Sequence, residues 1–413
     1  MPPTFVIIGA SLAGGTAAAT LRQDGFDGDV ILIGKEPHPP YERPPLSKQY
    51  LRGDVPFEKT WVRPSGFYEA NAIDTRFGDA AMQVDPAGRN VELASGQSVH
   101  YDKLLIATGV RNRRPTIPGL NLPNVFDLRS VNDADALRTE IVSGRKAAVI
   151  GMGFIGCEVA ASLRQKNVEV VCIDSSPTPL FRVLGEQVGQ VMSTIHHEHG
   201  VETFFDDAVT RFEGDGQAER VITKRGRHVD CDFAVVGVGV EPVVDVVAGS
   251  GVEISNGILV DEYCRTNVQD IFAAGDVANH YHPVFQKRMR VEHWQNAMQQ
   301  GAAAARSMLG RGQPYDAVHW FWSDQYDVNL QYAGFYREWD EVVMRGNPDT
   351  RDFIAFYLSR GCLDAVVALN RGKDVRRTMP LIKARTTVDP RQLADEDMDL
   401  RSLVAGRLSG AHS

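Results

Sequence analysis

A strand, a glycine-rich turn and a helix near the middle of the chain restrict the fold of this sequence most strongly. In "KAAVIGMGFIGCEVAASLRQKNVEVVCIDSS" an apolar strand leads into Gly151-x-Gly153-x-x-Gly156, and a helix and a second strand follow. The first glycine of such a turn permits a tight bend, the second lets a pyrophosphate approach the backbone, and the third brings the helix close to the strand. The pattern predicts a βαβ unit that binds a dinucleotide.

An acidic residue completes this pattern. Asp174 ends the second strand, 18 residues after Gly156 (174 − 156), where a carboxylate accepts hydrogen bonds from a ribose 2′-hydroxyl. Because a carboxylate repels a 2′-phosphate, we expect NADH to be preferred over NADPH. Arg182, eight residues further on (182 − 174), leaves another interpretation open. A guanidinium there can bind a 2′-phosphate, or it can contact the adenine or the pyrophosphate.

A second, incomplete copy of the turn opens the chain. "FVIIGASLAGGTAAATLR" contains Gly9-x-Ser11-x-x-Gly14, with serine in place of the middle glycine. Taken alone, it is equally compatible with an ordinary tight turn between a strand and a helix. The following strand, "VILIGKEP", has a glycine and a lysine where the acid is expected, and Glu36 comes next. Either Glu36 or a different contact therefore holds the adenosine ribose of this nucleotide.

Two further segments indicate which nucleotide binds the first turn. "YDKLLIATGV" is an apolar strand that ends in Ala-Thr108-Gly109, and "TNVQDIFAAGDVAN" places Asp276 directly after Ala-Ala-Gly. The second segment fits the pattern in which flavoproteins place an aspartate against the ribityl chain of FAD. Small residues at both places let the backbone lie close to the flavin. Together with two glycine turns, these segments predict a non-covalently bound FAD beside NAD.

The order of these segments predicts the domain organisation. We expect an α/β fold with two Rossmann-like dinucleotide-binding domains, as in glutathione reductase, and a small α+β C-terminal domain with an antiparallel sheet. The FAD-binding domain would be discontinuous, over residues 1–110 and 242–318, with the NAD-binding domain at 111–241 between them. Short aromatic and β-branched runs, such as "WFWSDQYDVNLQYAGFY", indicate the third domain at 319–413.

Composition excludes several classes of function. A net charge of −9 argues against nonspecific binding of nucleic acid or anionic membranes. The five cysteines form no CxxC pair, which indicates isolated thiols in a cytoplasmic protein and removes a disulfide redox centre. We expect neither a signal peptide nor a transmembrane segment. No metal site is predicted, because "HHEHG" at 196–200 falls in a predicted helix where a solvated face is the simpler interpretation.

The motifs together point to a known family. With both glycine turns, "YERPPLSK", "AAGD", "RVEHWQNAMQQGAAAA" and "WFWSDQYD", nearly the whole chain resembles the NADH-dependent ferredoxin reductases of bacterial oxygenase systems. The resemblance implies one FAD, a hydride taken from NADH, and single electrons passed to a small iron–sulfur protein. It also implies that Lys48, after the Pro-Pro pair, approaches the flavin N5 edge with Glu158 as its partner. A fixed cation there stabilises the negative charge of reduced flavin.

The resemblance extends to further residues with weaker signals. Ala13 and Ala81 match positions that contact FAD, although both are also suitable small core residues. Arg43 and Arg129 match positions near the flavin or its phosphates, with surface arginines as the alternative. Trp294 and Trp322 match aromatic flavin contacts, and Ile155 belongs to the NAD turn. The set predicted to bind cofactor is listed here in full: Gly9, Ser11, Ala13, Gly14, Glu36, Arg43, Lys48, Ala81, Thr108, Gly109, Arg129, Gly151, Gly153, Ile155, Gly156, Asp174, Arg182, Asp276, Trp294 and Trp322.

Three functions are compatible with these motifs. The first is electron transfer to a ferredoxin, which is expected to be acidic and to dock on a basic patch, with the enzyme a monomer or weak dimer. The second is reduction of a small acceptor such as a quinone or monodehydroascorbate. The third is a redox-sensing binding protein similar to apoptosis-inducing factor, in which reduction by NADH changes the partners. Rapid reduction of cytochrome c only in the presence of ferredoxin would favour the first.

Overall fold

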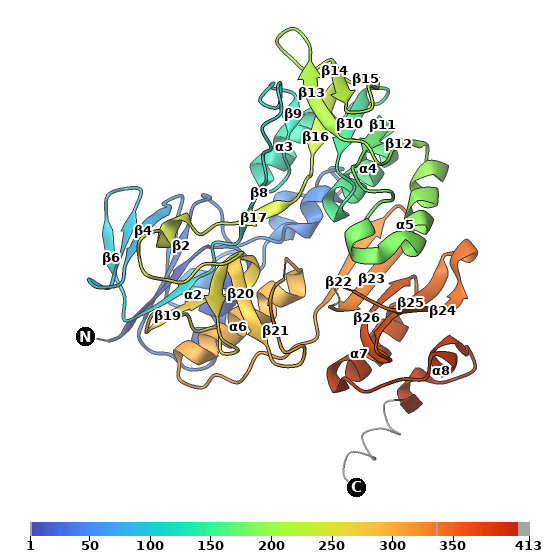
Figure 1. Ribbon diagram of the computed structural model, residues 1–413. Coiled ribbons are helices and arrows are strands. Elements are labelled where there is room, and N and C mark those ends of the chain that lie inside the picture. The colour runs from blue at the N-terminus through green and yellow to red at the C-terminus, as the bar shows by residue number, and fades with distance from the viewer. Residues whose placement is uncertain (1, 336–337, 404–413) are drawn as a thin grey trace. The chain divides into compact units, whose positions relative to one another are not determined.

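The chain folds into two compact units. The structure, a computed structural model, describes residues 2–335 and 338–403 (Figure 1). The first unit comprises residues 1–42, 57–111 and 241–320, and the second comprises 43–56, 112–240 and 321–413. A two-stranded sheet of β8 (Val110–Asn112) and β17 (Val240–Pro242) lies where the chain passes from one unit to the other.

A parallel five-stranded sheet forms the centre of the first unit. Its order is β19-β7-β1-β2-β3, and all four strand pairs are parallel. The strands are β1 (Thr4–Ile8), β2 (Asp29–Gly34), β3 (Ile73–Phe77), β7 (Lys103–Ile106) and β19 (Ile271–Ala273). The strands β1, β2, β7 and β19 are largely buried on both faces, as expected inside a parallel sheet, which explains their apolar sequences. The edge strand β3 is more polar, and only Ile73 is buried in it.

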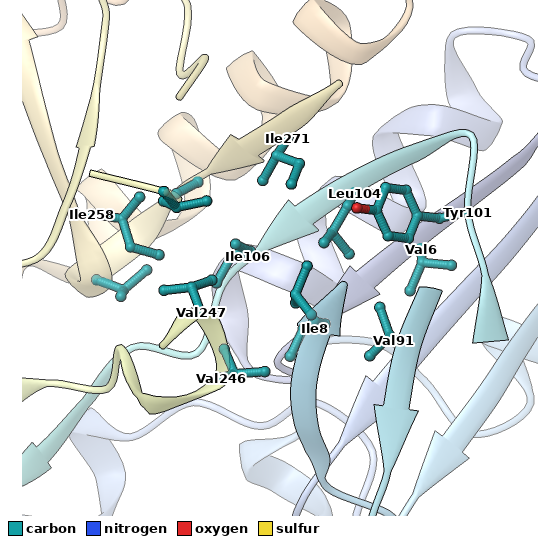
Figure 2. Close-up of a cluster of buried hydrophobic side chains, with 14 of the residues drawn as sticks. Val6, Ile8, Val91, Tyr101, Leu104, Ile106, Val246, Val247, Ile258 and Ile271 are labelled. Atoms are coloured by element: carbon teal, nitrogen blue, oxygen red, sulfur yellow. The ribbon is translucent and has the colours of Figure 1, made fainter. Parts of the chain in front are cut away.

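Alternate residues of β1, β2, β7 and β19 enter different cores. One face of the sheet packs on α1 (Leu12–Gln23) and α6 (Trp294–Met308), through residues such as Ile7, Leu105 and Ala304. The opposite face forms the cluster in Figure 2, where Val6, Ile8 and Ile106 gather with Val246 and Val247. This alternation follows from the two-residue period of a strand.

Smaller elements complete the first unit. Two three-stranded sheets have the orders β4-β5-β6 and β18-β20-β21. Their strands are β4 (Ala81–Asp85), β5 (Asn90–Leu93), β6 (Ser98–His100), β18 (Ile258–Val260), β20 (Ala278–His282) and β21 (Lys287–Arg290). Short helices are α2 (Phe67–Ala70), η2 (Phe57–Thr60), η3 (Asp245–Val247) and η4 (Gly275–Val277).

The second unit contains another parallel sheet, of order β12-β11-β10-β16-β9. Its strands are β9 (Val125–Phe126), β10 (Lys146–Ile150), β11 (Glu169–Ile173), β12 (Val201–Phe204) and β16 (Phe233–Val236). The helices are α3 (Val131–Glu140), α4 (Phe154–Gln165), α5 (Phe181–Glu198) and the 3₁₀ turn η1 (Pro44–Ser47). A β13-β14-β15 sheet is inserted before β16, from Val209–Glu213, Arg220–Thr223 and His228–Asp230. Helix α5 contains "HHE" of the histidine-rich segment, which confirms the helix predicted there. The predicted solvated face is wrong for His196, which is fully buried, whereas His197 is exposed.

An antiparallel five-stranded sheet ends the second unit, in the order β22-β23-β26-β25-β24. The strands are β22 (Trp320–Gln325), β23 (Val328–Gly334), β24 (Glu341–Asn347), β25 (Asp352–Ser359) and β26 (Cys362–Leu369), with η5 at Pro348–Thr350. Helices α7 (Gly372–Ala384) and α8 (Pro390–Ala394) follow. Two parallel dinucleotide-type sheets and this antiparallel sheet confirm the predicted fold class.

The division into units differs from the predicted domain organisation in two respects. The NAD-type sheet and the C-terminal sheet belong to one compact unit. Residues 43–56, which fall in the range predicted to bind FAD, also belong to this second unit. The three-domain division therefore stays a prediction.

Candidate functional site

The first glycine turn is shaped by close backbone contacts. Gly9 has a φ of 108°, which favours glycine, and its N–H donates to the carbonyl of Ile33 at 2.8 Å. A Cβ at Gly14 would lie 1.9 Å from the carbonyl oxygen of Gly9. Ser11 caps α1 with φ −115° and ψ −158°, an extended conformation that any residue adopts. Serine at the middle position is therefore compatible with the turn geometry.

The second glycine turn repeats this geometry at the start of α4. The N–H of Gly151 donates to the carbonyl of Ile173 at 2.8 Å. A Cβ at Gly151 would lie 2.5 Å from the oxygen of Gly237, and one at Gly156 would lie 1.9 Å from the oxygen of Gly151. Gly153 is different, because it is exposed and has nothing within 4 Å of an added Cβ. The helix N-terminus and the open side at Gly153 fit the approach of a pyrophosphate.

Hydrogen bonds hold the Asp174 side chain against this turn. Its carboxylate accepts hydrogen bonds from the backbone N–H of Met152 at 2.5 Å and of Ser176 at 2.6 Å. These bonds fix the carboxylate at the end of β11 and leave it lone pairs for ribose hydroxyls. Two residues before Arg182, the N–H of Leu180 donates to the Met152 carbonyl at 2.8 Å. The backbone leading to Arg182 therefore crosses beside the same turn.

Strand register explains why the first turn lacks an acid. Ile8 pairs with Ile33 in β1 and β2, as Ile150 pairs with Ile173 in β10 and β11. Gly34 therefore occupies the place of Asp174, and a Cβ there would lie 2.6 Å from the Cβ of Ala10. A carboxylate side chain does not fit at this position without a shift of that alanine.

Glu36, the alternative ribose contact, already accepts a hydrogen bond from the hydroxyl of Tyr41 at 2.5 Å. This bond orients the carboxylate, and its contact with a ribose stays a prediction.

Segments remote in sequence converge on α1 in the first unit. A Cβ at Gly275 would lie 2.9 Å from the Cβ of Ala13, and one at Gly301 would lie 2.3 Å from the Ala13 carbonyl oxygen. Asp276 follows Gly275 and is partly exposed. The "AAGD" segment and α6 thus meet the helix that begins at the first glycine turn, with no room for larger residues.

The other predicted FAD contacts of the first unit have varied surroundings. The Thr108 hydroxyl donates to the Val243 carbonyl at 2.6 Å, and Gly109, with φ 70°, follows it. Ala81 is the first residue of β4 and packs against the cluster of Figure 2. Trp294 begins α6 and packs against the cluster that contains Ala13. Thr108 has a structural hydrogen bond, and its cofactor contact stays a prediction.

A buried ion pair joins Lys48 and Glu158 in the second unit. The Lys48 Nζ lies 2.7 Å from Glu158 Oε2, and the exposed fractions of the two side chains are 8% and 5%. Lys48 follows η1, where Pro44 and Pro45 fix the backbone, and its Nζ also donates to the Pro44 carbonyl at 3.2 Å. Glu158 lies on α4, two residues after Gly156. The structure brings together the two residues predicted to act as a pair.

Glu158 also anchors a buried chain of hydrogen bonds that the sequence analysis missed. Its carboxylate accepts from the hydroxyls of Ser47 and Ser323, the latter at 2.7 Å. Gln325 donates to Ser323 at 3.1 Å, and His196 lies 3.0 Å from Gln325 Oε1.

A pattern in "WFWSDQYD" could have signalled this chain. Phe321, Ser323 and Gln325 occupy the buried positions of β22, and polar residues at such positions need buried partners. Trp322 alternates with them and is partly exposed.

The two arginines predicted near the flavin lie together in the second unit. The Arg43 guanidinium donates to the backbone carbonyl of Arg129. The Arg129 N–H in turn donates to Asp133 at 3.0 Å, next to the capping box of α3. Within the NAD turn, Ile155 is 43% exposed, an unusual environment for isoleucine that is consistent with a predicted nucleotide contact.

No pair of cysteines is joined. All five are free, and four of them are buried. Burial raises the pKa of Cys231 to about 12 and raises the pKa values of Cys157, Cys172 and Cys264 as well. A thiol with a raised pKa is a poor nucleophile, so these residues do not form a dithiol redox centre. Within the described ranges, no helix has the length and apolar character needed to cross a bilayer.

Comparison with known proteins identifies the family. The profile of the "Pyridine nucleotide-disulphide oxidoreductase" family matches residues 3–301, and that of "Reductase C-terminal" matches 320–404. Among curated proteins, rhodocoxin reductase of Rhodococcus erythropolis is 38% identical over 97% of this chain and 94% of its own length. The anthranilate 1,2-dioxygenase system ferredoxin–NAD(+) reductase component of Burkholderia cepacia is 39% identical over 97% and 99%.

Solved structures agree with these relatives. The ferredoxin reductase for the CYP199A2 system from Rhodopseudomonas palustris has a TM-score of 0.94 and 36% identity, covering 97% of this chain and 100% of its own. The covalent putidaredoxin reductase–putidaredoxin complex gives a TM-score of 0.95 at 30% identity, with 98% of both chains covered. The chain belongs to the pyridine nucleotide-disulphide oxidoreductase family and, within it, to the ferredoxin reductases of bacterial oxygenase systems.

Proposed function

We propose that this chain is an FAD-dependent NADH:ferredoxin reductase. It takes a hydride from NADH and passes single electrons to a small iron–sulfur ferredoxin, which supplies an oxygenase such as a cytochrome P450 or a ring-hydroxylating dioxygenase. One observation carries the proposal: two dinucleotide-type glycine turns begin helices on two parallel sheets. The five free cysteines support it, because they form no disulfide redox pair. The names of the relatives support the ferredoxin as acceptor.

The residues present fit both cofactors. In the first unit, the α1 N-terminus and its glycine turn would hold the FAD pyrophosphate, and Asp276 would accept a hydrogen bond from the ribityl chain. The meeting of Gly275 and Gly301 with Ala13 supports this, since the backbone there leaves no space for a Cβ. In the second unit, the α4 turn and Asp174 would hold the NAD. A bound flavin supplies the conversion of one hydride into two single-electron transfers.

Lys48 and Glu158 have positioning roles in this proposal. Glu158 holds the Lys48 ammonium in place, and Ser47 and Ser323 hold Glu158 through its two carboxylate oxygens. Lys48 therefore provides a fixed positive charge, which favours negative charge on a reduced flavin. Neither residue needs to transfer a proton, because the cofactors carry the chemistry.

The preference for NADH rests on Asp174. Substituting Asp174→Asn removes the charge and keeps the shape, so we expect the ratio of kcat/KM for NADH to that for NADPH to fall roughly 10- to 100-fold. Anaerobic stopped-flow measurement of flavin bleaching with each nucleotide tests this. Arg182→Gln is the matched comparison, and it should lower reaction with NADPH in the Asp174→Asn background. If Asp174→Asn keeps the wild-type ratio, Asp174 does not determine the preference.

Stopped-flow measurements also test which molecule accepts the electrons. Rapid cytochrome c reduction that depends on added ferredoxin supports the proposal, whereas equally rapid reduction of a quinone without ferredoxin would replace it with a small-acceptor reductase. A long-lived charge-transfer band with slow reoxidation and NADH-dependent dimerisation would replace it with a redox-sensing protein.

The partner is expected to be acidic and to approach basic residues of the first unit, for which the candidates are Lys287, Arg288, Arg290, Arg306 and Arg311. Of these, Arg306 is 51% exposed and pairs with Asp24 at 3.0 Å, whereas the Arg290 side chain is only 8% exposed and pairs with Glu292. Arg306 is thus better placed to meet a partner than Arg290. We propose a monomer or weak dimer in the cytoplasm, the compartment in which five free thiols are expected.

A further inference from the structure

Three buried histidines gather in the first unit, away from the glycine turns in sequence. His280 and His282 lie on β20, and His319 directly precedes β22. Their side chains are at most 1% exposed. One ring nitrogen from each lies within 4.8 Å of the others, and the ring centroids are 5.0 to 5.7 Å apart.

Strand geometry explains the gathering. Residues two apart on a strand share a face, so His280 and His282 point the same way. The antiparallel partner of His280 is Met289 on β21, and cross-strand partners also share a face. His319 reaches this face, where its Nε2 lies 3.2 Å from the Met289 sulfur. Three imidazoles and one thioether therefore occupy one buried position.

Hydrogen bonding leaves ring nitrogens available in this cluster. Neither nitrogen of His280 has a hydrogen-bond partner among the described residues. The Nε2 of His319 lies beside the Met289 sulfur, so an ion bound to that nitrogen is within reach of the thioether. The Nε2 of His282 lies 3.0 Å from the Ala317 carbonyl, so it carries the proton and Nδ1 presents a lone pair. Metal-binding histidines are oriented by such carbonyl contacts. A buried nitrogen without a partner destabilises the fold, so a ligand at this position would relieve that cost.

We propose that His280, His282 and His319 bind one Cu⁺ ion, with the Met289 sulfur as an additional ligand. Imidazole and thioether are soft or borderline ligands, and thioether favours Cu⁺. The ligand group contains no carboxylate, so the protein offers no negative charge to balance the ion. Because the cost of burying an ion rises with the square of its charge, a monovalent ion is favoured over Zn²⁺ at such a site.

The required movement is small. Metal–imidazole bonds of about 2.0–2.1 Å place ligand nitrogens about 3.4 Å apart, so the rings must close from the separation of up to 4.8 Å seen here. Side-chain rotation supplies this. Since the cluster is buried, we expect uptake to require local opening or to occur during folding.

Anaerobic competition between the full-length holoprotein and a chromophoric Cu⁺ chelator tests the site. We expect one Cu⁺ per chain and a higher Tm on binding. His282→Leu and His319→Leu should each weaken binding by roughly 100-fold or more. His196→Gln alters a histidine of equal burial in the second unit and should retain wild-type binding. All proteins carry Cys362→Ser, which removes the one cysteine of the five that is not buried.

If a histidine variant does not fold, X-ray absorption at the copper edge provides a second test. It is measured on the Cu⁺-bound protein that keeps all three histidines. Scattering from two or three imidazole rings supports the proposal. A shell of sulfur ligands alone would place the copper on thiols and overturn it, and so would retention of less than one Cu⁺ per two chains after competition. Preference for Zn²⁺ over Cu⁺ would also overturn it.

Discussion

Glu158 is the residue on which most of the second-unit site depends. One carboxylate oxygen faces Lys48 and Ser47, and the other accepts from Ser323. A buried ion pair is tolerated when its hydrogen-bonding capacity is filled in this way. The same arrangement makes each partner costly to remove alone, because the remaining charge is left in a nearly dry position.

We predict strong coupling between the two charges. Glu158→Gln and Lys48→Met should each lower the free energy of unfolding by about 3–5 kcal/mol, and the double variant should lose less than the sum of the two. Urea denaturation of the wild-type holoprotein, the two single variants and the double variant measures this coupling as a double-mutant cycle. Additive losses would show that the pair does not stabilise the fold. Lys166→Met, which removes an exposed ion pair with Asp54, is the control and should cost under about 1 kcal/mol.

At the scale of elements, different residues of each glycine turn meet different structural requirements. Gly9 and Gly151 provide the positive φ, and Gly14 and Gly156 provide the close approach of helix and strand. Ser11 and Gly153 occupy the N-cap positions of α1 and α4, where the requirement is only for a small side chain. These local requirements are visible in sequence, which is why both turns and their βαβ context could be predicted.

A pair of alanine substitutions separates packing from binding. Gly156→Ala forces a Cβ to within 1.9 Å of a backbone oxygen, so we expect α4 to shift and stability to fall by several kcal/mol, about 3 or more. Gly153→Ala enters open space, so the protein should fold normally but bind NADH more weakly. Thermal unfolding and NADH titration distinguish the two. Equal stability of the variants would contradict this division.

Contacts between distant segments were less predictable. Lys48 and Glu158 were paired only through the family resemblance, since 110 positions (158 − 48) separate them. Ser323 and Gln325 lie in "WFWSDQYD" and His196 lies in "HHEHG", but neither segment shows that these side chains bond to one another, because that depends on the packing of β22 against α5. The absence of a metal prediction has the same cause, as His319 lies 37 residues beyond His282 (319 − 282).

For the whole molecule, the second unit depends on contacts between α5 and the C-terminal sheet. His196 of α5 lies 3.0 Å from both Gln325 and the hydroxyl of Tyr326, and Tyr357 of β25 donates to the Leu184 carbonyl. A Cβ at Gly185, where α5 kinks, would lie 2.8 Å from the ring of Trp339. We therefore expect the NAD-type sheet and the C-terminal sheet to unfold together, as one cooperative unit.

Acid should weaken this unit. Burial lowers the pKa of His196 to about 4 from 6.5, so the unfolded chain binds a proton that the folded one does not. Stability is complete above about pH 6.5 and is lost as the pH falls toward 4, by up to about 3 kcal/mol from this residue. Urea denaturation across this range should show a shallower pH dependence for His196→Gln. Identical slopes would mean that His196 does not titrate as described.

The burial of the thiols affects how well the protein resists oxidation by hydrogen peroxide. Reduced flavins react with dioxygen, and the hydrogen peroxide that forms oxidises cysteine through its thiolate. Four of the five cysteines are buried with raised pKa values, so almost no thiolate is present at neutral pH. A reductase built in this way withstands its own by-product, and Cys362 is the position at which oxidative damage should begin.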